Sequence, residues 1–232
     1  MSKEEYLYTG QTNLEVMQSA VNYNKYLHDL VKREIRTTTK KNVKVLDFGA
    51  GIGTYADILK DRGIKVDCVE VDPNGVSVLK KKGYKVYSSA KEIKRKYDIV
   101  YSFNVLEHVE DDTALLREMK EVIKDDGSII IYVPAFNSIL TQLDVLVEHL
   151  RRYRSSDMTY LAIRSKLKIK RLQYCDPIGF ILAYIYKLIG GSGNLNPKTI
   201  WIFDRILFPF SRALELVTRK LFGKNILVVY KK

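Results

Sequence analysis

Cysteine, tryptophan and long apolar runs are scarce in this chain of 232 residues. The two cysteines, Cys68 and Cys175, lie far apart and form no Cys-x-x-Cys pair, so their spacing predicts neither a disulfide framework nor a metal site. We expect two plain thiols, no bound metal and a reducing cytoplasm. No apolar run reaches the roughly 18 residues that span a bilayer, and residues 1–10 are too polar for a signal peptide.

Acidic residues are also in short supply: 27 Asp and Glu face 39 Lys and Arg, which leaves a net charge of +12. This sign suits an anionic partner, such as nucleic acid, phospholipid head groups or a phosphorylated substrate. A basic surface that merely stays solvated explains the charge equally well. With 46% hydrophobic and 28% charged residues, the chain belongs to the folded class, and its length predicts one domain with an elaboration.

Glycines cluster in the stretch VLDFGAGIGTYADIL, residues 45–59. Its apolar start predicts a buried parallel strand, and an amphipathic helix is expected from about Thr54. Between them, Gly49, Gly51 and Gly53 allow a tight turn and a close approach of the backbone to a ligand. The first amides of the helix favour an anionic or carboxylate-bearing group. The stretch indicates a nucleotide-cofactor turn, with a glycine-rich turn that binds nothing as the alternative.

Two residues distinguish this turn from a dinucleotide fingerprint. The last position of Gly-x-Gly-x-x-Gly would be Thr54, which is not glycine, and Asp47 precedes the first glycine by two residues. An acid there repels a pyrophosphate but can hold the ammonium of an amino acid. The stretch resembles motif I of class I S-adenosylmethionine (SAM) methyltransferases. The resemblance implies that SAM binds, and S-adenosylhomocysteine is released, at Asp47, Gly49, Ala50, Gly51 and Gly53.

An acid follows the turn at the distance where a doubly wound fold holds a ribose. Glu70 lies near the end of a strand expected over residues 65–71, where a carboxylate can accept hydrogen bonds from both ribose hydroxyls. Asp72 competes for this role, but the helix opened by Pro73 makes it a good N-cap. We favour Glu70, with its neighbour Val71, as the ribose site.

Two later segments extend the resemblance. Ser89 and Ala90 lie where such enzymes contact the adenine. Many relatives have an acid at this position, whereas this chain has serine and alanine. The adenine contact is therefore either missing here or made by a serine hydroxyl or the backbone. The strand expected at 97–103 is followed by NVLEH, which matches the methyltransferase pattern and implies a loop on the methionine side of SAM. The cofactor contacts implied for this loop are Phe103, Asn104 and Val105.

His108 ends this second motif and has two interpretations. Its unperturbed pKa lies near neutrality, which suits a general base. We favour the alternative, in which His108 orients the loop and caps the next helix, expected over residues 111–124.

The alternation of strands and helices predicts a parallel sheet with right-handed crossovers, whose ligands lie at the carboxyl ends of the strands. Residues 125–127 are the expected turn into an apolar fifth strand. Strands at 167–174 and 225–230 form an antiparallel pair in the family topology. The resemblance implies an α/β, Rossmann-like class I methyltransferase fold, with a mixed seven-stranded sheet in the order 3-2-1-4-5-7-6 and helices on both faces.

The expected domain organisation is an N-terminal helical cover at 1–42 and a SAM-binding domain at 43–232. An apolar stripe over residues 12–36 predicts the covering helix. Its NYNKY segment is expected near the pocket, so Tyr23 is a candidate substrate contact, and packing alone is the alternative for this tyrosine.

Residues 133–158 resemble a subgroup in which Val-Pro-Ala leads to an aspartate and a His-x-Arg-Arg-Tyr segment. Relatives usually have glycine where this chain has Glu148, a change that affects the local turn. Methylation of an oxygen requires a proton acceptor, and His149 is our first candidate, oriented by Asp144. A clamp on a substrate carboxylate or phosphate is one interpretation of the next residues, and ion pairs that tether the loop are the other. The residues concerned are Arg151, Arg152 and Tyr153.

A helical insertion at about 176–224 separates the last two strands, where relatives have a short hairpin. Its later part places aromatic residues such as Trp201 and Phe210 among arginines and lysines, as an interfacial membrane helix does. A dimer face, a cover over a lipid-like substrate and ordinary core packing are the alternatives. Ser155 or Ser156 is expected to cap the helix before these strands.

These motifs predict SAM-dependent methylation, at an oxygen, of a small molecule, a sugar or a lipid-linked acceptor. Methylation of nucleic acid is the alternative that fits the charge, although no Asn-Pro-Pro-Tyr or Asp-Pro-Pro-Tyr motif follows the fourth strand and no RNA-binding module is evident. A SAM-binding subunit without catalysis is the alternative from another class. We expect a cytoplasmic protein that contacts the inner face of the membrane if the insertion binds lipid, and a homodimer is also open.

Overall fold

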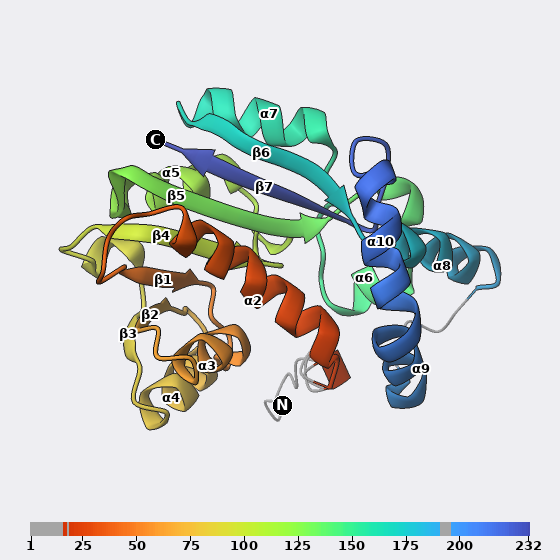
Figure 1. The fold of residues 1–232 in the computed structure, drawn as a ribbon, viewed down its shortest axis with the longest axis horizontal. Helices are drawn as coiled ribbons and strands as arrows, with labels where there is room; N and C mark the ends of the chain where they lie inside the picture. The colour runs from red at the N-terminus through yellow and green to blue at the C-terminus, as the bar shows by residue number, and fades with distance from the viewer. Residues whose placement is uncertain (1–15, 18, 191–195) are drawn as a thin grey trace, which may run out of the picture.

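A seven-stranded mixed sheet forms the centre of the structure, with helices on both faces (Figure 1). The computed structural model describes residues 16–17, 19–190 and 196–232. The strand order is β3-β2-β1-β4-β5-β7-β6, in which β7 is antiparallel to β5 and β6 and the other neighbours are parallel. This order confirms the predicted topology. The strands are β1 (Val45–Phe48), β2 (Val66–Val69), β3 (Lys85–Tyr87), β4 (Tyr97–Phe103), β5 (Ile123–Pro134), β6 (Lys168–Cys175) and β7 (Asn225–Lys231).

The helices connect the strands and then build the insertion. The α-helices are α2 (Val21–Arg36), α3 (Thr54–Lys60), α4 (Pro73–Lys81), α5 (Asp112–Val122), α6 (Gln142–Leu146), α7 (Ser155–Arg164), α8 (Pro177–Leu188), α9 (Pro197–Ile202) and α10 (Phe208–Thr218). The shorter turns are η1 (Ala90–Glu92), η2 (Leu106–His108), η3 (Asn137–Ile139) and the π-helical η4 (Phe203–Leu207). None of the helices among the described residues combines the length and the apolar character needed to cross a membrane.

Two apolar layers cover the two faces of the sheet, so its central strands are buried on both sides. All four residues of β1 and all seven of β4 are buried, the pattern expected of parallel strands. On one face Leu27 of α2, Leu59 of α3 and Phe208 of α10 share a core. On the other face Leu116 of α5 and Met158 of α7 share a second core. The leading helix is thus part of the packed body.

The leading helix begins later than the apolar stripe predicts. Its first residue is Val21, and Ala20 has non-helical dihedral angles of φ −79° and ψ 75°. Residues 12–15 of the predicted helix lie outside the described residues. The side chain of Asp204, from the insertion, accepts the backbone N–H groups of Asn22 and Tyr23. This long-range cap sets the start of α2. The residues next to this helix start do not predict it, because the capping side chain lies far away in the sequence.

Two predicted helix caps were wrong. Helix α7 starts at Ser155 itself, with Arg154 at the N-cap and its backbone N–H bound to the Asp157 carboxylate. Helix α5 is capped by Asp111, which accepts the N–H of Ala114 at 2.8 Å, and not by the histidine of the second motif. In both cases a nearby carboxylate meets the free amides of the first turn.

The predicted turn at 125–127 lies inside β5, which already begins at Ile123. Ile123 pairs with Tyr97, and the register then shifts before Ile99 pairs with Ser128. The extra residues form an irregular stretch of the strand, as a bulge does. The polar sequence there looks like a turn because it is exposed at this irregularity.

The insertion between β6 and β7 is helical, as predicted. It contains α8, α9, η4 and α10, and residues 191–195 of its connector lie outside the described residues. Figure 1 shows these helices together at one end of the molecule, away from β2 and β3.

Candidate active site

The glycine turn lies at the carboxyl end of β1 and is open on one side. Gly49 and Gly53 have positive φ angles of 82° and 89°, which glycine adopts readily. A Cβ at Gly49 would lie 2.5 Å from the Val105 side chain, so this glycine is needed for close packing. A Cβ at Gly51 would meet nothing within 4 Å. The turn is therefore tight on its protein side and accessible at Gly51.

Glu70 faces this turn from the end of β2. One carboxylate oxygen accepts the N–H of Gly51 at 2.5 Å, and the other accepts the N–H groups of Val71 and Asp72 at 2.8 Å each. The Asp72 carboxylate accepts the N–H of Gly75 and caps α4, as predicted. The structure thus separates the two acids, because Asp72 serves the helix while Glu70 lies at the turn.

The adenine side is built from η1. Ser89 is the N-cap of this turn and accepts the N–H of Lys91 through its hydroxyl, while Ala90 is buried. The side chain of Val71 is 78% exposed next to Glu70. The carboxylate of Glu92, also in η1, accepts the backbone N–H of Ser88 at 3.2 Å.

Asp47 is buried beneath the turn. Its carboxylate accepts the hydroxyl of Tyr101 at 2.8 Å and is 1% exposed. The pKa of Asp47 is raised to about 7. Burial is the main cause, the negative charge of Glu70 adds to it, and the hydrogen bond from Tyr101 opposes both. A cationic group bound nearby would favour the ionised form of Asp47.

An aromatic wall lies between the turn and the leading helix. The rings of Phe103 and Tyr55 pack edge to face at 5.3 Å, and Phe103 also lies 6.2 Å from Tyr132. The ring centroids of Tyr23 and Tyr132 lie 6.2 Å apart. Burial raises the pKa of the Tyr23 phenol well above its usual value. Asn104 follows with φ 54° and donates its N–H to the carbonyl of Tyr132.

Tyr23 is a buried member of this wall, and as a substrate contact it stays a prediction. Tyr55 and Tyr132 were not predicted as site residues. Each lies on an element that also supplies packing residues, so no sequence signal separates them from ordinary core tyrosines.

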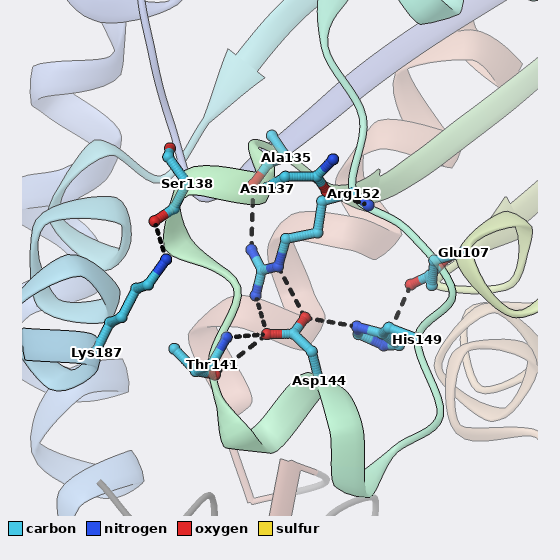
Figure 2. Close-up of polar contacts among 9 residues, drawn as sticks. All are labelled: Glu107, Ala135, Asn137, Ser138, Thr141, Asp144, His149, Arg152 and Lys187. Carbon is cyan, nitrogen blue, oxygen red and sulfur yellow. Dashed lines mark hydrogen bonds and ion pairs between the residues drawn. The ribbon is translucent and has the colours of Figure 1, made fainter. Parts of the chain in front are cut away.

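The loop after β5 holds a network of polar side chains centred on Asp144 (Figure 2). His149 Nδ1 lies 2.8 Å from Asp144 Oδ1, and Arg152 contacts the same carboxylate through Nε at 2.8 Å and Nη2 at 3.0 Å. The Thr141 N–H and hydroxyl also donate to Asp144. Burial alone would raise the pKa of Asp144, but hydrogen bonds from His149 and Arg152 outweigh it and hold that pKa well below its usual range.

Arg152 and Tyr153 belong to the framework of this loop, which favours the tethering alternative, and as substrate contacts they stay predictions. Arg152 is 6% exposed, and its remaining nitrogen donates to the Ala135 carbonyl. The Tyr153 hydroxyl donates to the Leu106 carbonyl and lies 3.1 Å from Asp112. Each guanidinium nitrogen of Arg152 and the hydroxyl of Tyr153 already has a partner within the loop framework, so the tethering alternative fits the geometry.

Arg151 is more exposed but is also paired. Its guanidinium contacts the Asp112 carboxylate at 3.3 Å and donates to the carbonyl of Glu110. This pairing ties the loop to the start of α5. As a substrate contact, Arg151 stays a prediction.

Glu107 is the site residue that sequence reasoning missed, although it stands inside the second motif. It is fully buried, and neither carboxylate oxygen has a hydrogen-bond partner among the described residues. Burial raises its pKa to about 8. The nearest basic nitrogen is Nε2 of His149, 3.8 Å from Glu107 Oε1. A buried carboxyl without partners is costly and marks a functional position.

His108 packs against this pair. Its ring lies 4.8 Å from that of His149. Burial and the nearby His149 lower the pKa of His108 to about 4. Glu107, His108 and His149 bring one ligand atom each within 4.8 Å of one another, close enough to share a metal ion. Their separation in the sequence predicts no such grouping, since His149 reaches it only through the loop after β5.

Glu148 has a left-handed conformation with φ 58°. This is the conformation that glycine adopts most easily, which accounts for the glycine of related sequences. Glu148 therefore adopts at this turn a conformation that costs a non-glycine residue energy.

The sheet order, the glycine turn with its opposing acid, and the loop after β4 define a class I SAM-dependent methyltransferase. The model of a family described as a methyltransferase domain matches residues 19–176. The chain belongs to this family and uses SAM as its cofactor.

Individual relatives are more distant. The ubiquinone biosynthesis O-methyltransferase of Pelagibacter ubique (strain HTCC1062) is 28% identical over 118 residues, which is 46% of this chain and 48% of that protein. The chain thus matches about half the length of this curated relative.

Solved structures agree with the fold. A SAM-dependent methyltransferase from Archaeoglobus fulgidus has a TM-score of 0.57 at 18% identity, covering 90% of this chain and 94% of that one. Magnesium protoporphyrin IX methyltransferase from Synechocystis PCC 6803, with bound SAM, has a TM-score of 0.55 at 11% identity, covering 100% and 87%.

Proposed function

We propose that this enzyme methylates an oxygen of a small-molecule, sugar or lipid-linked acceptor, with His149 as the proton acceptor. The observation that carries the proposal is the short contact between His149 Nδ1 and Asp144 Oδ1. It orients the opposite ring nitrogen toward the buried carboxyl of Glu107.

The described residues fit SAM at the turn. The backbone is open at Gly51, Glu70 offers carboxylate oxygens at the ribose position, and Asp47 offers an acid for an ammonium. When bound, SAM supplies a methyl group on a positively charged sulfur. The chain must then hold the acceptor oxygen in line with that methyl group and exclude water, because orientation contributes much of the rate.

In this proposal the proton of the acceptor hydroxyl goes to His149. The lowered pKa keeps Asp144 ionised, so it accepts the hydrogen of Nδ1 and leaves the lone pair of His149 on Nε2. As the oxygen–carbon bond forms, Nε2 takes the hydroxyl proton. The resulting imidazolium lies between Asp144 and the buried carboxyl of Glu107, and the negative charge of Asp144 stabilises it.

The choice of oxygen has support outside the geometry, because the matched part of the Pelagibacter ubique protein belongs to an O-methyltransferase. The choice of a small or lipid-linked acceptor is supported by the absence of a recognisable nucleic-acid groove motif in the sequence.

A transfer assay tests the proposal. Purified protein and tritiated SAM are incubated with two pools, one of lipid and glycan extracts and one of total RNA and DNA. Label in the first pool is expected, and label in nucleic acid would overturn the acceptor class.

The role of His149 is tested by substitution to alanine. We expect a loss of transfer of about a hundredfold or more, with SAM affinity by calorimetry unchanged. His108→Asn is the matched control in the same cluster and is expected to lose much less. Full activity of the His149 variant would exclude it as the base.

A further inference from the structure

The helical rod formed by α9, η4 and α10 buries several polar side chains and exposes large apolar ones, while Ile200, Phe203 and Phe208 pack on the core. Its buried positions follow helical spacing, and four of the five are polar. They are Asp204, Phe208, Ser211, Glu215 and Thr218. Its exposed side is apolar, with side chains that are roughly half to three-quarters exposed. They include Trp201, Ile206, Phe210, Leu216 and Val217. A helix that packs on a water-soluble core normally shows the opposite arrangement.

Specific polar contacts hold the rod in this orientation. Asp204 accepts the N–H groups at the start of α2, Ser211 donates to the carboxylate of Asp176 at 2.7 Å, and Glu215 accepts the side-chain amide of Gln173 at 2.8 Å. Rotating the rod to bury its apolar side would break all three contacts. The apolar side is thus held outward by the fold.

Helix α8 adds to the same surface. Only Pro177 and Gly179 are buried in it, and its apolar side chains are exposed, among them Ile185 at 47% and Leu188 at 69%. In Figure 1, α8 lies beside α10 at the same end of the molecule.

The charge of the insertion has one sign at its surface. Residues 176–224 contain three acids, Asp176, Asp204 and Glu215, and each is at most 3% exposed. The basic residues of the same segment are Lys187, Lys198, Arg205, Arg212, Arg219, Lys220 and Lys224. A second copy of this surface would therefore meet like charge, whereas anionic phospholipid meets opposite charge.

We propose that the insertion docks the enzyme on an anionic phospholipid bilayer. The apolar side chains of α8 and the rod enter the boundary between head groups and acyl chains, with Trp201 at head-group depth and the basic side chains on the phosphates. The proposal is independent of the methyl acceptor.

Vesicle binding tests the proposal with the full chain. Vesicles of phosphatidylcholine with about a third phosphatidylglycerol are compared with phosphatidylcholine alone, by flotation and by the fluorescence of Trp201. This tryptophan is unique in the sequence, so its emission reports on the insertion. We expect flotation and a blue shift with the anionic vesicles, both weakened by high salt.

Two variants locate the contact. Phe210 and Val217 are 67% and 73% exposed, so the double change Phe210→Glu and Val217→Glu is expected to leave the fold intact and to reduce vesicle binding at least tenfold. The matched control is Ile163→Glu, at an equally exposed apolar residue of α7, and it should bind like the parent. The idea is overturned if the parent does not float. It is also overturned if the double variant binds normally, or if it only converts a dimer to a monomer.

Discussion

The carboxylate of Asp204 accepts the backbone N–H of Tyr23 at 2.8 Å across 181 residues of sequence. Its other oxygen accepts the N–H of Asn22 at 2.9 Å, and Asp204 itself is fully buried. One side chain of the insertion therefore caps the helix that carries a predicted substrate contact. The insertion and the leading helix are thus joined by hydrogen bonds between residues far apart in the sequence.

Replacing Asp204 by alanine is expected to lower the free energy of unfolding by about 2 kcal/mol, because the buried N–H of Tyr23 and the partly buried N–H of Asn22 lose their acceptor. Chemical denaturation measures the change. Asp125→Ala removes an aspartate whose side chain is 95% exposed and should change stability by less than about 0.5 kcal/mol. Equal effects of the two substitutions would contradict the capping role.

Replacing Glu70 by alanine is expected to weaken SAM binding by about 1 to 3 kcal/mol, since hydrogen bonds to a charged group are lost. Calorimetry measures the affinity. Asp72→Ala is the control, because Asp72 caps α4 through Gly75 and should leave the affinity within about twofold. An unchanged affinity in the Glu70 variant would remove its assignment to the ribose.

Asp47 makes the SAM-free protein sensitive to pH. Its folded pKa is raised to about 7 by burial, so the folded state holds this proton more tightly than the unfolded chain does. The contribution of Asp47 to stability therefore falls as pH rises from about 4 to 7. Chemical denaturation at several pH values in this range measures the free energy of unfolding. That of the parent should fall, relative to that of Asp47→Asn, as the pH rises.

SAM binding should respond in the opposite direction. If Asp47 holds the ammonium of SAM, its ionised form is the one that binds, and the affinity rises between pH 6 and pH 8. Asp47→Asn should lose this rise. A variant that keeps the full pH dependence would place the titrating group elsewhere.

Glu148→Gly tests the left-handed turn before His149. Glycine relieves a conformational cost of about 1 to 2 kcal/mol but adds about 0.5 to 1 kcal/mol of unfolded-state entropy. A neutral to slightly stabilising effect is expected in denaturation. Val145→Gly, at an exposed position inside α6, should instead destabilise by about 1 kcal/mol. Equal losses in both variants would contradict the strain at this turn.

Much of the fold was predictable because its signals are local. The glycine turn, the buried strands and the N-cap at Asp72 each depend on a few adjacent residues, and the structure has them where they were expected. The start of α2 and the caps of α5 and α7 were wrong, because a helix end follows whichever acceptor reaches its free amides. For α2 the acceptor is far away in the sequence. For α5 and α7 it is one of several nearby side chains that could serve as the cap.

The sequence by itself determined the class of the protein: its motifs give the cofactor turn and the acid that faces it, and their resemblance to class I methyltransferases implies the sheet order. Only the tertiary structure decided how the polar residues of the later loop are used. Asp144 takes both His149 and Arg152, so Arg152 supports the loop while His149 faces Glu107. The tertiary structure also decided that the acids of the insertion are buried and its apolar side chains are exposed. The physical reason is that these pairings join residues far apart in the chain, and only packing determines which partners meet.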